Sequence, residues 1–158
     1  MFRNVAELVE QAEQEQVKIA EIMIRQEIEV SGVTREQIMA KMDRNLTVME
    51  QAVEKGLQGV RSLSGLTGGD AVLLQNYIRS GKSLSGELLL DAVSKAVATN
   101  EVNAAMGTIC ATPTAGSAGV VPGTLFAIKH KLNPTLAIKH KLNPTREEMV
   151  EFLFTAGA

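Results

Sequence analysis

The chain has 158 residues, of which 45% are hydrophobic and 22% charged, so it carries enough apolar material for a packed core and is not expected to be disordered. Its formal net charge of -2 makes nucleic acid and anionic membrane surfaces unexpected partners, since both attract clustered Lys and Arg. One cysteine allows no internal disulfide, and because neither the apolar core of a signal peptide nor a membrane-spanning apolar run occurs, we expect a protein of the reducing cytoplasm.

Two amphipathic helices are predicted in the first third of the chain. Residues 4–30 place apolar side chains on one face, with Glu, Gln and Lys between them. The apolar face consists of Val5, Leu8, Val9, Ala12, Ile19, Ile22, Met23 and Val30. A Ser-Gly pair at 31–32 ends this helix, and a capping box of Thr34 and Gln37 starts a second helix that continues to Gly56.

The middle of the chain is predicted to be rich in loops. Residues 60–86 hold many Gly and Ser around one short helix, Asp70 to Arg79. Asp70 fits the first turn of that helix, where its charge faces the positive end of the helix dipole, and a ligand contact is the alternative. Residues 87–98 form another short helical segment, and no alternating β-branched pattern predicts a strand, so the expected fold class is all-α.

A Gly-Lys-Ser sequence at 81–83 matches only the end of a phosphate-binding loop. Position 76, where that motif requires glycine, is Asn76, and no buried strand precedes it, so nucleotide binding is not predicted. Lys82 could also be proposed as the Schiff-base lysine of a pyridoxal phosphate enzyme. A lysine between Gly and Ser is not diagnostic of that chemistry, so we interpret Lys82 as a solvated loop residue.

Residues 126–145 contain a tandem ten-residue duplication, because AIKHKLNPT at 127–135 recurs at 137–145. The two histidines, His130 and His140, would lie about 80° apart around a helix, and an Asn-Pro pair would break that helix, so they are not predicted to be a metal pair. Only the second copy leads into a capping box at 145–148, which makes the first copy the additional one.

Residues 100–124, NEVNAAMGTICATPTAGSAGVVPGT, are interpreted as a Gly/Thr-rich substrate loop. Glycines at 116 and 119 permit turns that expose successive N–H groups, and a helix starting near Val120 would direct its N-terminal N–H groups at a carboxylate. Polar residues directly upstream favour a binding site over a flexible linker. The predicted substrate-binding residues are Asn100, Glu101, Asn103, Thr112, Thr114, Gly116 and Ser117. Cys110 lies among apolar neighbours and is interpreted as a small buried hydrophobe.

Three stretches, NEVNAAMGTICATPTAGSAGVVPGTLF, TGGDAVLLQNYIRSGKSLSG and DAVSKAVATNEVNAAMG, resemble the iron-sulfur-dependent L-serine dehydratase alpha chain. The resemblance covers residues 1–158 apart from the duplication. It implies an alpha chain with a [4Fe-4S] cluster that works with a separate beta chain and converts L-serine to pyruvate and ammonia without pyridoxal phosphate. It also implies that residues 100–103 and 112–119 lie at the substrate pocket, while the catalytic base stays unknown. Iron bound to the serine hydroxyl would polarise the C–O bond while a base removes the α-proton.

The cluster ligands that this resemblance implies are cysteines in patterns such as G-G-C and C-D-P-V-A-G, which do not occur in this sequence. One cysteine cannot hold such a cluster, so no metal ligand is predicted within residues 1–158. We therefore expect the chain to be the N-terminal portion of the alpha-chain domain, truncated at the C-terminus and inactive alone. Two other hypotheses stay open: a related cysteine desulfidase, and a non-catalytic helical module that binds a partner helix.

Overall fold

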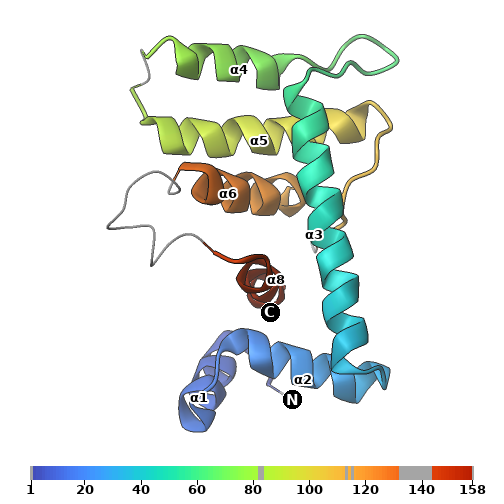
Figure 1. Cartoon of the computed structure of the whole chain (residues 1–158), viewed down its shortest axis with the longest axis vertical. Helices are drawn as coiled ribbons and strands as arrows, with labels where there is room; N and C mark the ends of the chain where they lie inside the picture. The colour runs from blue at the N-terminus through green and yellow to red at the C-terminus, as the bar shows by residue number, and fades with distance from the viewer. Residues whose placement is uncertain (1, 82–83, 113, 115, 132–143, 158) are drawn as a thin grey trace. The chain divides into compact units, whose positions relative to one another are not determined.

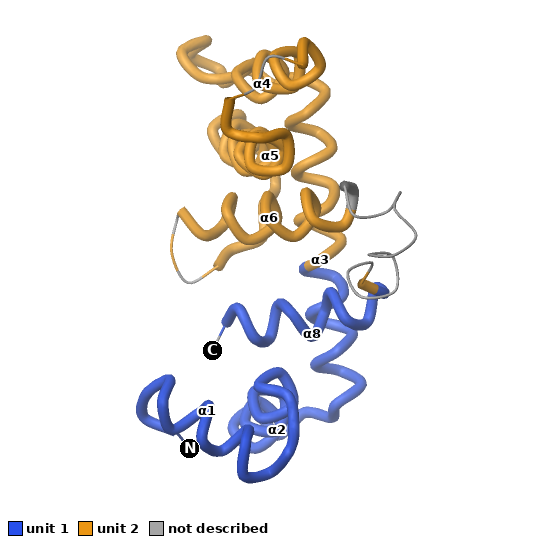
Figure 2. The backbone as a smooth tube through the Cα atoms, turned by 90° about the vertical axis from the view of Figure 1, so that its left-hand side faces the viewer, with its two compact units in different colours: residues 1–45, 145–158 blue, residues 46–144 orange. Residues whose placement is uncertain are grey.

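A computed structural model of the chain describes residues 2–81, 84–112, 114, 116–131 and 144–157 (Figure 1). These residues form seven α-helices and no strand, which confirms the predicted all-α fold class. The chain divides into two compact units: Met1–Asn45 with Thr145–Ala158, and Leu46–Pro144 (Figure 2). Helix α3, Arg35–Leu57, contributes residues to both units. No described helix has both the length and the apolar character needed to cross a bilayer.

The first unit contains α1 (Val5–Glu15), α2 (Ile19–Ser31), the start of α3, and α8 (Arg146–Ala156). Within it, α2 packs on α8 and contacts α1. The prediction of one continuous helix over 4–30 is wrong, because α1 ends at Gln16, which adopts a left-handed φ of 54°. Its backbone N–H is directed back to the carbonyls of Ala12 and Glu13, which closes the helix in the manner of a C-terminal cap.

The break after α1 changes which apolar residues are buried. Leu8 of α1 is buried, as are Ala20, Ile22 and Ile24 of α2. By contrast, Val5 and Val30, both assigned to the apolar face of a single helix, are 68% and 65% exposed. The reason is that α1 and α2 each bury a separate face against the core. Residues that would lie on one face of a single continuous helix therefore no longer lie on a common face.

Both predicted capping boxes form in this unit. The Thr34 backbone N–H donates to Gln37 Oε1 at 3.1 Å, and the Gln37 N–H donates to Thr34 Oγ1 at 3.4 Å. At the start of α8, the Thr145 N–H donates to Glu148 Oε2 at 2.7 Å, and the Glu148 N–H donates to Thr145 Oγ1 at 3.2 Å. Each box satisfies two backbone donors that the first helical turn leaves without a partner.

The second unit contains α4 (Asp70–Arg79), α5 (Glu87–Ala104), α6 (Ser117–Lys131) and the end of α3. The bounds of α4 agree with the predicted helix, and Asp70 lies in its first turn as expected. Helix α5 extends beyond the predicted 87–98 and packs against both α4 and α6 (Figure 1). The residues from Asn100 to Asn103 are therefore helical rather than part of a loop.

Close contact between α5 and α6 depends on small residues. A Cβ atom at Gly119 would lie 2.8 Å from the Ala96 carbonyl oxygen, and one at Gly123 would lie 2.7 Å from the Ala92 carbonyl oxygen. Real Cβ atoms do not approach backbone oxygens this closely, so both positions require glycine at the observed helix separation. The expectation that Gly119 serves a turn is wrong, because it is buried inside α6 without a left-handed φ.

Candidate functional site

Three of the predicted substrate-binding residues meet at the start of α6. Thr112 Oγ1 lies 2.5 Å from Ser117 Oγ, and Thr114 Oγ1 lies 3.0 Å from the same oxygen. The Thr114 N–H donates to Ser117 Oγ at 3.1 Å, while the Ser117 N–H donates to Thr114 Oγ1 at 3.1 Å. This reciprocal pair caps the N-terminus of α6 and fixes the positions of the hydroxyl groups. We call Thr112, Thr114 and Ser117 the hydroxyl cluster.

The hydroxyl cluster is compact because its hydroxyl hydrogens are used locally. Thr112 Oγ1 donates to the Thr114 carbonyl at 3.1 Å, and Ser117 Oγ donates to the same carbonyl at 2.8 Å. Thr114 is exposed, whereas Thr112 and Ser117 are half-buried. Since a hydroxyl can rotate its hydrogen about the C–O bond, these donors can turn to an incoming anion without backbone movement.

Asn100 lies beside this end of α6, although it belongs to α5. Its side-chain Oδ1 and Nδ2 atoms would both lie 3.1 Å from a Cβ atom at Gly119, two residues after Ser117. The residue is exposed, so its amide group can contact a small molecule at this end of the helix. Because Gly119 has no side chain, it leaves room for the Asn100 amide. Gly119 therefore has a second role besides allowing α5 and α6 to pack closely.

Glu101 is not brought together with the hydroxyl cluster. It is 3% exposed, and its Oε1 atom accepts a hydrogen bond of 2.6 Å from the Asp70 backbone N–H at the start of α4. Its Oε2 atom is buried and has no hydrogen-bond partner within the described part of the chain. The Glu101 carboxylate thus holds α4 against α5, and it does so by satisfying one of the free N–H groups of the first turn.

The remaining predicted residues occupy less defined positions. Asn103 is exposed in the last turn of α5, and its carbonyl accepts a hydrogen bond of 3.0 Å from the Met106 N–H. Gly116 is exposed and lies in the expected turn, but it has no left-handed φ and open space surrounds the position of a Cβ atom, so this turn does not require glycine. Lys82 and His140 lie outside the described residues.

Cys110 is a half-buried thiol whose Sγ donates a weak hydrogen bond of 3.5 Å to the Ala111 carbonyl. Burial raises the pKa of this thiol, which disfavours the thiolate needed for nucleophilic attack or metal binding. The raised pKa agrees with an unreactive thiol, but Cys110 is only half-buried rather than the buried hydrophobe that the sequence predicted. Across the described ranges, no group of three or more His, Cys, Asp or Glu side chains is placed to hold a metal ion.

Sequence reasoning missed a buried polar network between α4 and α5. Lys95 forms an ion pair with Asp91, and both residues are buried. Gln75 Nε2 donates to Asp91 Oδ1 at 3.1 Å and to Ser94 Oγ at 3.0 Å, and Ser94 Oγ donates to the Ala71 carbonyl at 3.1 Å. The available signal was the four-residue spacing of Asp91 and Lys95 within an otherwise apolar helix.

Comparisons with known proteins point to the serine dehydratase alpha chain. The model of the family described as "Serine dehydratase alpha chain" matches residues 14–158. "Probable L-serine dehydratase, alpha chain" of Bacillus subtilis (strain 168) is 69% identical over 158 residues, which is 100% of this chain and 49% of that protein. "L-serine dehydratase, alpha chain" of Peptoniphilus asaccharolyticus is 36% identical over 134 residues, covering 84% of this chain and 46% of that protein. The chain thus spans about half the length of these relatives. No solved structure matches the chain.

Proposed function

The chain belongs to the serine dehydratase alpha chain family, and we propose that it supplies the N-terminal part of the alpha subunit of an L-serine ammonia-lyase. We assign the carboxylate of L-serine to the hydroxyl cluster and Asn100. The observation that supports this assignment is that three hydroxyl groups meet at the N-terminus of α6, with the Asn100 amide beside Gly119 in the first turn of that helix.

The reaction favours such a site. Dehydration removes the Cα proton and the β-hydroxyl of serine, and the resulting aminoacrylate then hydrolyses to pyruvate and ammonia. The carboxylate keeps its bonds throughout, so fixed donors can hold it from substrate to product. Hydroxyl groups, an amide and the N-terminal end of a helix can donate hydrogen bonds to both carboxylate oxygens.

We propose that the ligands of the [4Fe-4S] cluster lie in the part of the relatives' length that this chain does not span. The residues at hand do not fit such a cluster, which takes three or four thiolates. Cys110 is a single cysteine whose pKa is raised by burial. The role proposed for residues 1–158 is accordingly to bind and orient the substrate, in an enzyme that also includes a beta chain.

A chimeric enzyme tests this function directly. Residues 1–158 are joined to the second half of the Bacillus subtilis relative and assembled with the beta chain under anaerobic conditions with iron. We expect pyruvate to form from L-serine. In this chimera Thr112→Val should raise KM about tenfold with a smaller change in kcat, because one carboxylate hydrogen bond is lost from substrate and transition state alike.

Thr124→Val is the matched control, because the Thr124 hydroxyl lies on α6, the helix that the hydroxyl cluster caps, and bonds only to the carbonyls of Val120 and Val121. Its KM should stay unchanged. An unchanged KM in the Thr112→Val chimera would contradict the carboxylate assignment. Faster turnover of L-cysteine than of L-serine would favour the cysteine desulfidase hypothesis, and beta-chain binding without turnover, whether or not iron is supplied, would favour the non-catalytic module.

A further inference from the structure

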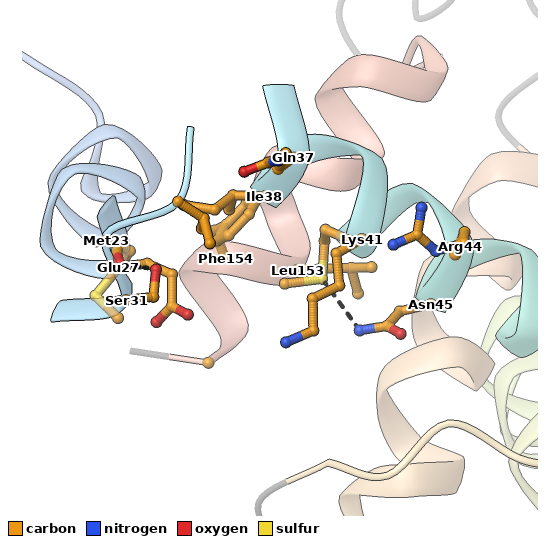
Figure 3. Close-up of a pocket in the computed structure, with 13 residues that line it drawn as sticks. Met23, Glu27, Ser31, Gln37, Ile38, Lys41, Arg44, Asn45, Leu153 and Phe154 are labelled. Carbon is orange, nitrogen blue, oxygen red and sulfur yellow. Dashed lines mark hydrogen bonds between the residues drawn. The ribbon is translucent and has the colours of Figure 1, made fainter. Parts of the chain in front are cut away.

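A pocket of about 550 Å³ lies within the unit formed by residues 1–45 and 145–158. It is open to solvent and is lined mainly by residues of α2, α3 and α8 (Figure 3). Pockets of roughly 300–1,000 Å³ are the usual size for small-molecule sites in proteins. None of its lining residues belongs to the unit that carries the hydroxyl cluster.

Apolar side chains form one part of the pocket wall. Ile38 of α3 and both Leu153 and Phe154 of α8 are buried residues that line it. Two methionines, Met23 of α2 and Met42 of α3, complete this surface. Methionine side chains adapt their shape to apolar ligands, so this wall suits a bulky hydrocarbon group.

The polar residues of the pocket are divided by charge. Figure 3 shows Glu27 on α2 at one side and Lys41 and Arg44 on α3 at the other, with the α8 residues between them. Asn45 lies on the α3 side, where its Nδ2 atom makes only a weak contact of 4.0 Å with Met42 Sδ. This amide can therefore turn to a stronger acceptor.

The three charged groups have no ion-pair partner among the residues that the structure describes. In the same unit Glu21 pairs with Arg35 at 2.8 Å, and Lys18 pairs with Glu151 at 2.7 Å. Glu27, Lys41 and Arg44 are exposed, so their charges are available to a molecule that enters from solvent.

We propose that this pocket binds a free amino acid with a large apolar side chain. Its ammonium group pairs with Glu27, its carboxylate pairs with Lys41 and Arg44, and its side chain packs against Leu153 and Phe154. An apolar carboxylic acid would leave Glu27 unpaired, and an apolar amine would leave both cations unpaired. Only a zwitterion with an apolar side chain satisfies all three parts of the pocket.

This site is distinct from the proposed substrate site, and the test below does not depend on turnover. L-serine has the same ammonium and carboxylate groups but no apolar side chain, so it should bind the pocket more weakly than L-phenylalanine. Failure of the proposed function would leave this prediction unchanged, because binding is measured on the 158-residue chain itself.

Methionine-methyl NMR can locate the binding directly. The chain has seven methionines, so each methyl signal can be assigned by single substitution. Titration with L-phenylalanine should shift the Met23 and Met42 methyl signals until they saturate. Met106, which is 83% exposed and belongs to the other unit, should not shift. Unmoved Met23 and Met42 signals would overturn the proposal.

Two matched analogues test the zwitterion requirement. Hydrocinnamate lacks the amino group of L-phenylalanine, and phenethylamine lacks its carboxylate. Hydrocinnamate loses the one charge pair with Glu27 and should bind about fivefold more weakly than L-phenylalanine, the size expected for one solvent-exposed pair. Phenethylamine loses the pairs with both Lys41 and Arg44, so its affinity should fall by at least about fivefold. Equal affinity for all three compounds would show apolar partition alone and would overturn the proposal.

Charge-neutral substitutions test the assigned contacts. Glu27→Gln and Lys41→Gln should each weaken L-phenylalanine binding about fivefold, by the same argument. Glu54→Gln and Lys55→Gln are the matched controls, because both residues are exposed on α3 outside the pocket and belong to the other unit. Equal losses in the control variants would refute a role for Glu27 and Lys41.

Discussion

Replacing Gly123 with alanine tests the close packing of α5 against α6. The added Cβ atom would lie 2.7 Å from the Ala92 carbonyl oxygen, 2.8 Å from the Ala96 nitrogen and 3.0 Å from the Ala96 Cβ. Two of these three neighbours are backbone atoms of α5, so no side-chain rotation can relieve the overlap. The helices must separate by several tenths of an ångström, roughly the amount that brings such contacts back to ordinary van der Waals distance.

Two opposing effects set the magnitude. Alanine in a helix interior is favoured over glycine by about 1 kcal/mol, and this gain applies wherever the helix is not crowded. Overpacking a close contact costs about 1–3 kcal/mol, and the backbone neighbours at Gly123 place this site toward the upper end. We therefore expect Gly123→Ala to lower the free energy of unfolding by about 1–2 kcal/mol.

Urea unfolding followed by far-ultraviolet circular dichroism measures this change. Gly116→Ala is the control, because a Cβ atom at Gly116 meets no atom within 4 Å and Gly116 has no left-handed φ. We expect the control to change the unfolding free energy by less than about 0.5 kcal/mol, as exposed substitutions usually do. Stabilisation by Gly123→Ala would refute the reasoning, since it would mean that helix propensity outweighs any crowding between α5 and α6.

Two further predictions concern charged residues. Lys95→Met should destabilise the chain by about 3–5 kcal/mol in the same urea assay, because it leaves the buried Asp91 without its ion-pair partner. Combining Lys95→Met with Asp91→Leu should recover most of this lost stability. Equal destabilisation by the single and double variants would contradict the pairing argument. Hydrogen bonds from Arg35 lower the pKa of Glu21 below its ordinary value of 4.5, so the stability it contributes is present above that value and is lost as pH falls through the lowered pKa. Glu21→Gln should therefore reduce the acid dependence of the unfolding free energy below pH 4.5, and an unchanged pH profile would refute the assignment.

The grouping of the loop residues of the candidate site could be predicted from the sequence, whereas the position of Glu101 in α5 could not. Thr112, Thr114 and Ser117 lie within five residues of one another, so their hydroxyl groups meet through local backbone geometry. Glu101 could not be placed in this way, because its contact with the Asp70 N–H joins residues 31 positions apart. Nothing in the local sequence distinguishes a glutamate that faces α4 from one that faces a ligand.

The amino-acid sequence by itself determined the all-α class and most helix starts, since capping boxes such as that of Thr145 and Glu148 are interactions within one turn. The tertiary structure alone decided the burial of Lys95 with Asp91 and the glycine requirement at Gly123. Each of these depends on which helix packs against which. Contacts between distant segments, rather than local propensity, set the free energy of burial and the space available to each side chain.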